Sequence, residues 1–224
     1  MAKKKLIHFA ENLTFPHLFQ PTYKELKAGF PLKGKWRQAH FRNDAPITLE
    51  LGCGKGEYTV NLALHKPDRN YIGIDIKGAR LWRGCKTVEE LGLKNVAFIR
   101  TRIEYMDQLL AQDEADELWL TFPDPQPKSR RRHKRLTSPE FLSRYARVLK
   151  PGSIIHLKTD DLDMFNYTLD TIGEYHHRLL FSSEDIYKTE QPHEATAIQT
   201  FYEKMYRQEN IPIKYLEFIL NDGR

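Results

Sequence analysis

Short β-prone runs and apolar helical stripes alternate along the chain from residue 47 onward. The first run, residues 47–51, leads into a glycine-rich turn, after which Val60, Ala63 and Leu64 fall at i, i+3 and i+4 on one helical face. The same pattern predicts further strands at residues 71–75, 96–99, 118–122 and 153–159. It predicts helices at residues 79–91, 137–149 and from about 161. This alternation indicates right-handed βαβ units and a parallel sheet covered on both faces.

The beginning of the chain lacks this regularity. It carries proline and glycine at close intervals, at Pro16, Pro21, Gly29, Pro31 and Gly34, and no sustained periodicity. We therefore expect two parts: a basic N-terminal arm with little regular structure at residues 1–45, and one regular domain at residues 46–224.

Composition excludes several classes of protein. A chain of 224 residues with 40% hydrophobic and 29% charged residues fits one globular domain and not a disordered chain. Two cysteines cannot form a disulfide framework or a four-thiolate metal site, and the nine histidines show no metal-ligand spacing, so we expect no metal. The apolar runs are too short for a membrane span or a signal peptide, which predicts a cytoplasmic protein with no membrane partner.

Positive charge is concentrated in one segment. The formal net charge is +5, but the eight residues from Lys128 to Arg135 contain six lysines and arginines. Such a segment repels itself unless a polyanion neutralises it. Charge alone leaves two interpretations open, a solvated basic loop or sorting signal, and a nucleic-acid contact.

Two acids are expected near the glycine-rich turn, at the carboxyl edge of the predicted sheet, where doubly wound folds bind ligands. The turn Gly52-Cys53-Gly54-Lys55-Gly56 matches neither a dinucleotide fingerprint nor a phosphate loop. Glu50 precedes it and would repel a pyrophosphate, whereas Asp75 ends the next strand, where a carboxylate can accept ribose hydroxyls. Adenosine with a positive appendage, as in S-adenosylmethionine, suits both acids. A nicotinamide enzyme and a scaffold that has lost its ligand remain alternatives.

A third acid, Asp124, lies between two prolines at the end of the strand predicted at residues 118–122, immediately before the basic segment. The run from Phe122 to Lys128, Phe-Pro-Asp-Pro-Gln-Pro-Lys, with the arginine-rich sequence after it, resembles the tRNA (guanine-N7-)-methyltransferase family. The motifs Leu-Glu-Leu-Gly-Cys-Gly-Lys-Gly, Gly-Ile-Asp, Lys-Thr-Asp and Thr-Phe-Tyr-Glu, beginning at residues 49, 73, 158 and 200, also resemble it. The likeness extends from about residue 47 to the C-terminus.

The resemblance implies a class I methyltransferase fold, a Rossmann-like doubly wound α/β structure with a seven-stranded, mostly parallel sheet. Its last strands would lie near residues 177–182 and 214–220. It implies methyl transfer from S-adenosylmethionine to N7 of guanine 46 in the variable loop of tRNA, giving 7-methylguanosine. The implied cofactor residues are Glu50, Gly52, Gly54, Asp75, Arg102 and Asp124. Asp124 is also the implied catalytic residue. The implied tRNA contacts are Lys128, Asp160, Thr200, Phe201, Tyr202 and Glu203.

Two departures from the family pattern and two rival functions qualify this interpretation. Arg102 stands where the family often carries Asp or Asn near the adenine, so we expect backbone groups to contact that base. Gln126 replaces the usual Trp, which removes an aromatic platform.

The two rival functions are a nucleic-acid methyltransferase that acts on an amine and a non-catalytic RNA-binding protein. Sequence leaves open whether the chain is a monomer or a homodimer.

Overall fold

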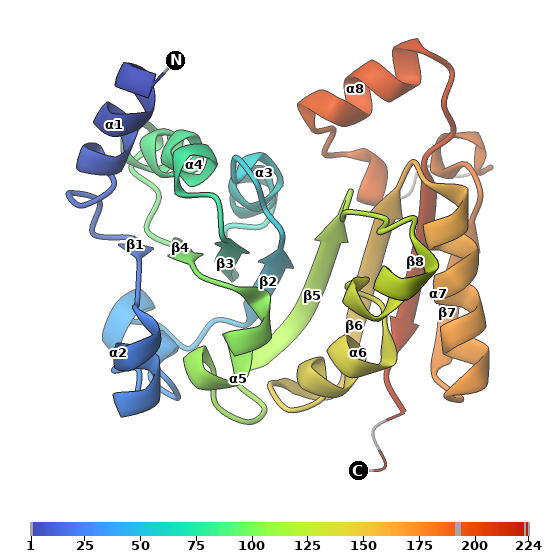
Figure 1. Cartoon of the computed structure of the whole chain (residues 1–224), viewed down its shortest axis with the longest axis horizontal. Helices are drawn as coiled ribbons and strands as arrows, with labels where there is room; N and C mark the ends of the chain where they lie inside the picture. Colours follow the sequence, from blue (N-terminus) through green and yellow to red (C-terminus); the bar gives the residue numbers. More distant parts are fainter. Residues whose placement is uncertain (1, 191–193, 222, 224) are drawn as a thin grey trace.

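A computed structural model describes residues 2–190, 194–221 and 223. The described part is built on one sheet with the strand order β1-β4-β3-β2-β5-β6-β8-β7 (Figure 1). All neighbouring strands pair in parallel except β8, which is antiparallel to β6 and β7. The strands are β1 (Leu18–Phe19), β2 (Ile47–Leu51), β3 (Asn70–Asp75), β4 (Val96–Arg100), β5 (Ala115–Thr121), β6 (Leu149–Thr159), β7 (Arg178–Ser183) and β8 (Lys214–Ile219).

Helices connect these strands. The α-helices are α1 (Ala2–Glu11), α2 (Tyr23–Ala28), α3 (Glu57–His65), α4 (Gly78–Leu91), α5 (Met106–Leu109), α6 (Pro139–Tyr145), α7 (Leu162–Glu174) and α8 (Phe201–Gln208). Shorter helical turns are the π-helical η1 (Trp36–Phe41) and the 3₁₀ turns η2 (Ile103–Tyr105), η3 (Ser129–Lys134), η4 (Ile186–Lys188) and η5 (Glu194–Thr196).

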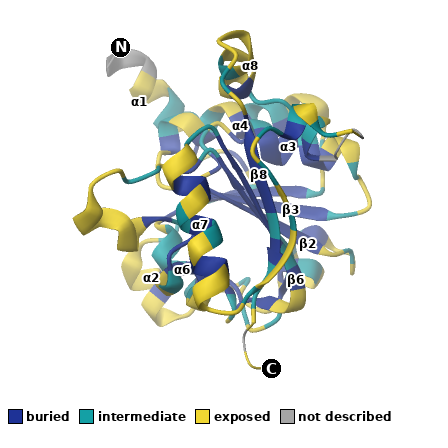
Figure 2. Cartoon of the chain, turned by 90° about the vertical axis from the view of Figure 1, so that its right-hand side faces the viewer, coloured by how far each residue is buried: buried dark blue, intermediate teal, exposed yellow. Residues whose placement is uncertain are grey.

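The sheet is buried on both faces except at its edge strand β7, which is mostly exposed, and each face has its own apolar core. Buried residues of α5, α6 and α7 pack against one face, while buried residues of α3 and α4 pack against the other. Figure 2 shows the central strands buried and the outer faces of the helices exposed. Alternate residues of each strand point to opposite faces. Strand β2 accordingly sends Leu49 to the first core and Glu50 to the face covered by α3.

The predicted α/β doubly wound sheet is confirmed, with one more strand than expected. The extra strand is β1, which comes from the N-terminal arm and pairs in parallel with β4. Helix α1 of the same arm packs on α4, where the His8 and Trp82 rings stack with 3.8 Å between centroids and the Asn12 amide donates to the carbonyl of Gly78 (2.8 Å). The expectation of little regular structure at residues 1–45 was therefore wrong. The boundary near residue 45 stays a prediction.

The strand order reverses between β2 and β5. Strand β2 lies between β3 and β5, so the chain first adds strands on one side of it and then on the other. The carboxyl ends of strands at such a switch point are where doubly wound folds bind ligands. Helix α8 and the N-terminus of α3 lie at this end of the sheet (Figure 1).

Candidate functional site

The turn after β2 is built from glycines because its backbone is left-handed. Gly52, Gly54 and Gly56 have φ angles of +76°, +57° and +68°, a region that side chains disfavour. A Cβ on Gly54 would meet only the Gly52 carbonyl at 3.9 Å, so this backbone is open to a ligand. A Cβ on Gly56 would lie 2.4 Å from the Phe98 ring, so this glycine lets α3 pack closely on the sheet.

Asp75 ends β3 and binds this turn. The Gly54 N–H donates to Oδ2 of Asp75 (2.9 Å), and the Lys77 N–H donates to Oδ1 (2.7 Å). The residue is 9% exposed. Each carboxylate oxygen has a second lone pair, so the same group can also accept a ribose hydroxyl.

Glu50 lies at the floor of the site, and its carboxylate is already occupied. Oε2 accepts from the Thr59 N–H (2.8 Å) and from the Thr59 hydroxyl, and Oε1 accepts from the hydroxyl of Thr121. Burial raises the pKa of Glu50, although the bonds from Thr121 and Thr59 lower it in part. Glu50 therefore joins β2 to α3 and β5. Its predicted contact with the cofactor stays a prediction.

A pocket of about 120 Å³ is lined by Glu50 and the glycine turn, whereas Asp75 is not among its lining residues. Its walls include the glycine turn, the end of β5 at Thr121 and Phe122, and residues 200–202 at the start of α8. The Phe201 N–H donates to the Glu57 carboxylate (3.0 Å), and Lys55 Nζ lies 5.6 Å from the centroid of the Phe201 ring. Segments far apart in the sequence thus line one pocket.

Asp124 is exposed and lies in the loop after β5, which we call the rim loop, two residues beyond Phe122 in the sequence. Phe122 lines the pocket, whereas Asp124 is not among its lining residues. The Gln126 N–H donates to Oδ1 of Asp124 (3.0 Å), forming a local turn. Phe122 and Gln126 both have left-handed backbones, with φ of +49° and +47°. Bulky residues seldom adopt this conformation, and such residues concentrate at functional sites. The loop carrying Asp124 is therefore held in an unusual geometry.

The basic segment follows directly and forms η3. Lys128, Lys134 and the arginines 130–132 are exposed, whereas Arg135 is fully buried. Arg135 pairs with Asp163, so its charge does not face solvent. The segment therefore presents five positive charges and not the six counted in the sequence.

The residues predicted to contact tRNA are divided between surface and interior. Lys128, Phe201 and Tyr202 are exposed, while Thr200 caps α8. Asp160 is half-buried, and burial raises the pKa of its carboxyl. The Glu203 side chain is fully buried, lies 2.7 Å from Lys158 Nζ and completes the α8 capping box. The structure thus places Glu203 in an internal ion pair, and its predicted contact with tRNA stays a prediction.

Two further residues considered from the sequence have clear surroundings. Arg102 is exposed and pairs with Glu104 (2.9 Å), outside the pocket wall. The neighbouring Thr101 N–H donates to the Asp75 carbonyl (3.2 Å), which joins the ends of β3 and β4. Cys53 is buried, and burial raises its pKa well above the usual range, so its side chain fills space within the turn as an uncharged thiol.

Sequence reasoning missed several residues of the site. Arg80 on α4 lines the pocket, although its spacing from Asp75 gave no signal. Thr121 binds Glu50 and could have been found as the last polar residue before the Phe-Pro-Asp-Pro motif. Tyr206 on α8 is a further aromatic residue near the pocket wall at Phe122. Its ring lies 5.9 Å from that of Phe122, and its hydroxyl interacts with Asp160.

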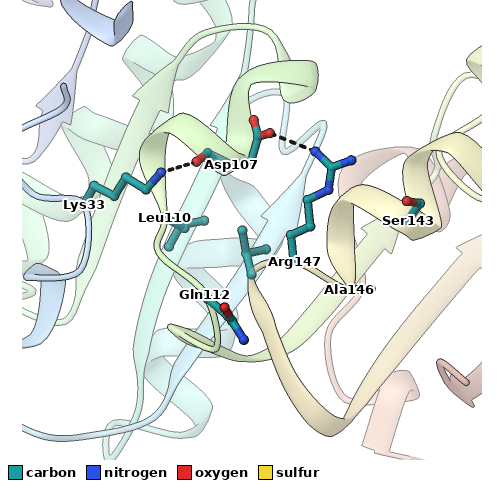
Figure 3. Close-up of a pocket in the computed structure, with 8 residues that line it drawn as sticks. Lys33, Asp107, Leu110, Gln112, Ser143, Ala146 and Arg147 are labelled. Carbon is teal, nitrogen blue, oxygen red and sulfur yellow. Dashed lines mark hydrogen bonds and ion pairs between the residues drawn. The ribbon is translucent and has the colours of Figure 1, made fainter. Parts of the chain in front are cut away.

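A larger hollow, of about 490 Å³, lies near the amino ends of β5 and β6, away from this site. Figure 3 shows Asp107 between two cations there: Lys33 Nζ donates to its carbonyl (2.6 Å), and Arg147 pairs with its carboxylate (3.2 Å).

Among the described residues, no cluster of His, Cys, Asp or Glu could hold a metal ion. No helix in the part of the chain that the structure describes is long and apolar enough to cross a membrane.

Known proteins resemble the chain in sequence and in fold. A family model described as "Putative methyltransferase" matches residues 44–216. A tRNA (guanine-N(7)-)-methyltransferase of Christiangramia forsetii is 54% identical over 97% of this chain and 98% of the relative. A protein of the same name from Bacteroides fragilis is 46% identical over 98% of this chain and 87% of the relative. The crystal structure of the 16S rRNA methyltransferase KamB has a TM-score of 0.62 at 17% identity, covering 83% of this chain and 93% of that chain.

Proposed function

The chain belongs to the tRNA (guanine-N(7)-)-methyltransferase family, and from this premise we propose that it transfers a methyl group from S-adenosylmethionine to N7 of a guanine in tRNA. The product is 7-methylguanosine. The motif resemblance assigns the guanine to position 46 of the variable loop. The observation that carries this proposal is that the exposed Asp124 lies in the rim loop, which connects the pocket wall at Phe122 with the basic segment.

The residues around the glycine turn suit the cofactor. The open backbone at Gly54 gives space for a ligand, and Asp75 has acceptor capacity for ribose hydroxyls. The buried acid Glu50 gives the floor a negative potential that favours a cation. S-adenosylmethionine supplies an electrophilic methyl group on a sulfonium.

Guanine N7 determines what the protein has to supply. N7 carries a free lone pair and no proton, so methyl transfer needs alignment and desolvation but no general base. We assign Asp124 the role of accepting hydrogen bonds from the N1 and N2 protons of guanine. Its negative charge also stabilises the positive charge that develops on the purine. Phe122 and Tyr202 line the pocket, and in this proposal they supply aromatic walls for the base.

The basic segment suits the phosphates of a folded RNA. Five exposed cations adjoin Asp124, so phosphate contacts would fix the RNA while the base enters the site. Phosphate contacts position a nucleic acid without reading its sequence. The choice of guanine therefore rests on Asp124 and the pocket.

Nucleoside analysis tests the proposal directly. The purified protein would be incubated with unmodified tRNA and methyl-labelled S-adenosylmethionine, and the tRNA then digested to nucleosides. We expect the label in 7-methylguanosine, at one guanine of the variable loop. Label in a methylated amine, or binding without transfer, would instead support one of the two rival functions.

Asp124→Asn tests the proposed catalytic role. The amide keeps the size of the side chain but loses the charge, so we expect the single-turnover rate to fall by about two to three orders of magnitude. Asp68→Asn is the matched control, because Asp68 is an exposed acid in the loop before β3. The rate should show no rise near neutral pH that reports a base. Wild-type speed in Asp124→Asn would remove this residue from the mechanism.

A further inference from the structure

Arg135 differs from every other cation of the basic segment. Its side chain has no exposed surface, and its guanidinium is fully engaged with protein groups. Nε donates to the carbonyl of Pro125 (2.8 Å), and one terminal nitrogen pairs with the Asp163 carboxylate. The other terminal nitrogen donates to the Asp163 carbonyl (3.4 Å), and the guanidinium carbon lies 4.5 Å from the centroid of the Tyr167 ring.

These contacts connect two elements that the sequence separates. Pro125 follows Asp124 in the rim loop, whereas Asp163 and Tyr167 belong to the first turns of α7. We infer that Arg135 is a positioning residue for methyl transfer, which holds the Asp124 loop against α7 and does not contact tRNA. This inference rests on the proposed function and deepens it.

The conformation of the loop explains why such a contact is needed. The left-handed residues Phe122 and Gln126 stand on either side of Asp124. Strained backbone of this kind persists only where surrounding contacts over-determine it. Within the loop, the Gln126 N–H bond to Asp124 fixes the acid relative to its own backbone, and Arg135 fixes that backbone through Pro125. Loss of Arg135 would therefore free Asp124 to move without removing its charge.

Charge gives an independent reason to exclude tRNA contact by Arg135. A phosphate contact requires an accessible cation whose counterions are released on binding. Arg135 is inaccessible and is already neutralised by Asp163, whereas Arg131 is exposed on η3. Substitution of these two arginines should thus affect different steps: Arg135 the rate of methyl transfer and Arg131 the binding of tRNA.

The test compares Arg135→Gln with Arg131→Gln in the full-length protein. Arg135→Gln should lower the single-turnover rate at saturating tRNA by about 10- to 100-fold, because small misplacements at a reacting centre have effects of this size. Its tRNA affinity and salt dependence should match the wild type. Arg131→Gln should weaken tRNA binding and reduce the slope of log affinity against log salt by about one. If Arg135→Gln shows the Arg131 pattern, or a wild-type rate, the inference is wrong.

Asp163→Ala provides a second test if Arg135→Gln does not fold. The Asp163 side chain is half exposed, so we expect its removal to leave the fold intact while it breaks the ion pair with Arg135. We expect this variant to lower the rate in the same direction, and the double variant to be no slower than Arg135→Gln alone. Hydrogen exchange at the Gln126 amide gives a readout that does not depend on activity, and its protection should fall in both single variants. A wild-type rate and unchanged protection in Asp163→Ala would overturn the inference. A wild type that fails to form 7-methylguanosine would instead contradict the proposed function.

Discussion

Asp75 binds the glycine turn and, in our proposal, the cofactor ribose through the same carboxylate. Asp75→Ala should weaken S-adenosylmethionine binding by about 1.5–3 kcal/mol, the range for hydrogen bonds to a charged group. Calorimetric titration of the folded variant measures this loss. Asp68→Ala removes an exposed acid away from the pocket and should leave the affinity unchanged. If Asp75→Ala binds as tightly as the wild type, the ribose assignment fails.

His156 is a buried titratable group of the sheet that methyl transfer does not use. It stacks on Trp119 with 3.9 Å between ring centroids, and its Nε2 lies 3.0 Å from the Glu117 carboxylate. Burial lowers the pKa of His156, but Glu117 and Glu217 raise it more, so the net shift is upward from 6.5. The pKa of Glu117 is lowered to about 2, because His156 and Arg69 outweigh its burial.

These shifts predict opposite pH dependences of stability. The His156 contribution is fully present below its unfolded pKa of 6.5 and is lost as pH rises through the higher folded value. The Glu117 contribution is present above 4.5 and is lost as pH falls toward about 2. Denaturant unfolding above pH 6.5 should show the wild type losing stability faster than His156→Gln. Parallel curves for the two proteins would show that His156 does not hold its proton through this contact.

Helix α8 is held at the site by a buried ion pair. Lys158 on β6 lies 2.7 Å from the Glu203 carboxylate and also donates to the carbonyls of Ala195 (2.6 Å) and Ile198 (2.9 Å). Burial lowers the pKa of Lys158, although Glu203 raises it in part. Because α8 begins at the pocket wall, this pair positions that wall relative to β6.

Removing one partner of the Lys158–Glu203 ion pair should destabilise the protein more than replacing both partners by apolar residues. Glu203→Ala should cost about 3–5 kcal/mol of stability, because it leaves a buried ammonium without its counter-charge. A double variant with Lys158→Met and Glu203→Leu should recover much of this loss, since an apolar pair of similar volume needs no desolvated charges. Urea unfolding measures both. If the double variant is less stable than Glu203→Ala, then the packing of the two side chains, and not their charges, determines the stability at this position.

The basic segment should act as an electrostatic element toward tRNA. Replacing Arg130, Arg131 and Arg132 together by Ala should weaken binding and flatten the slope of log affinity against log salt by up to about three contacts. Arg132 should contribute less to the slope than the other two arginines, because Asp163 lies 3.6 Å from its guanidinium and partly neutralises its charge. A triple Ala variant at Lys24, Lys27 and Lys35 removes equal charge near α2 and should leave the slope unchanged. An unaltered slope in the arginine variant would place the tRNA elsewhere.

At the scale of the whole molecule, the central sheet could be predicted because its strands alternate with helices at short, regular intervals. The strand β1 could not, since two residues have no detectable period and this strand forms only by pairing with β4. The regular structure of the N-terminal arm was underestimated, because it depends on contacts between positions far apart in the sequence, such as the stacking of His8 on Trp82.

The site shows the same limit. The places of Asp75, the glycine turn and Asp124 at the ends of strands could be predicted from local motifs, and their roles stay predictions. The internal roles of Arg135 and Glu203 could not, because each depends on a partner in another element: Asp163 for Arg135 and Lys158 for Glu203. Both residues lie in motifs that suggested surface contact with RNA, and a pattern of charges does not show which of them fold inward.

The central claim is that guanine N7 receives the methyl group, and the most direct test changes that one atom. Methyl transfer would be measured with tRNA containing 7-deazaguanine at the proposed position, where carbon replaces N7, beside the same tRNA with ordinary guanine. The replacement keeps the N1 and N2 protons that Asp124 would bind. We predict that the deaza tRNA binds with similar affinity and receives no label there, while the guanine tRNA is methylated. Equal methylation of the two tRNAs would contradict the account.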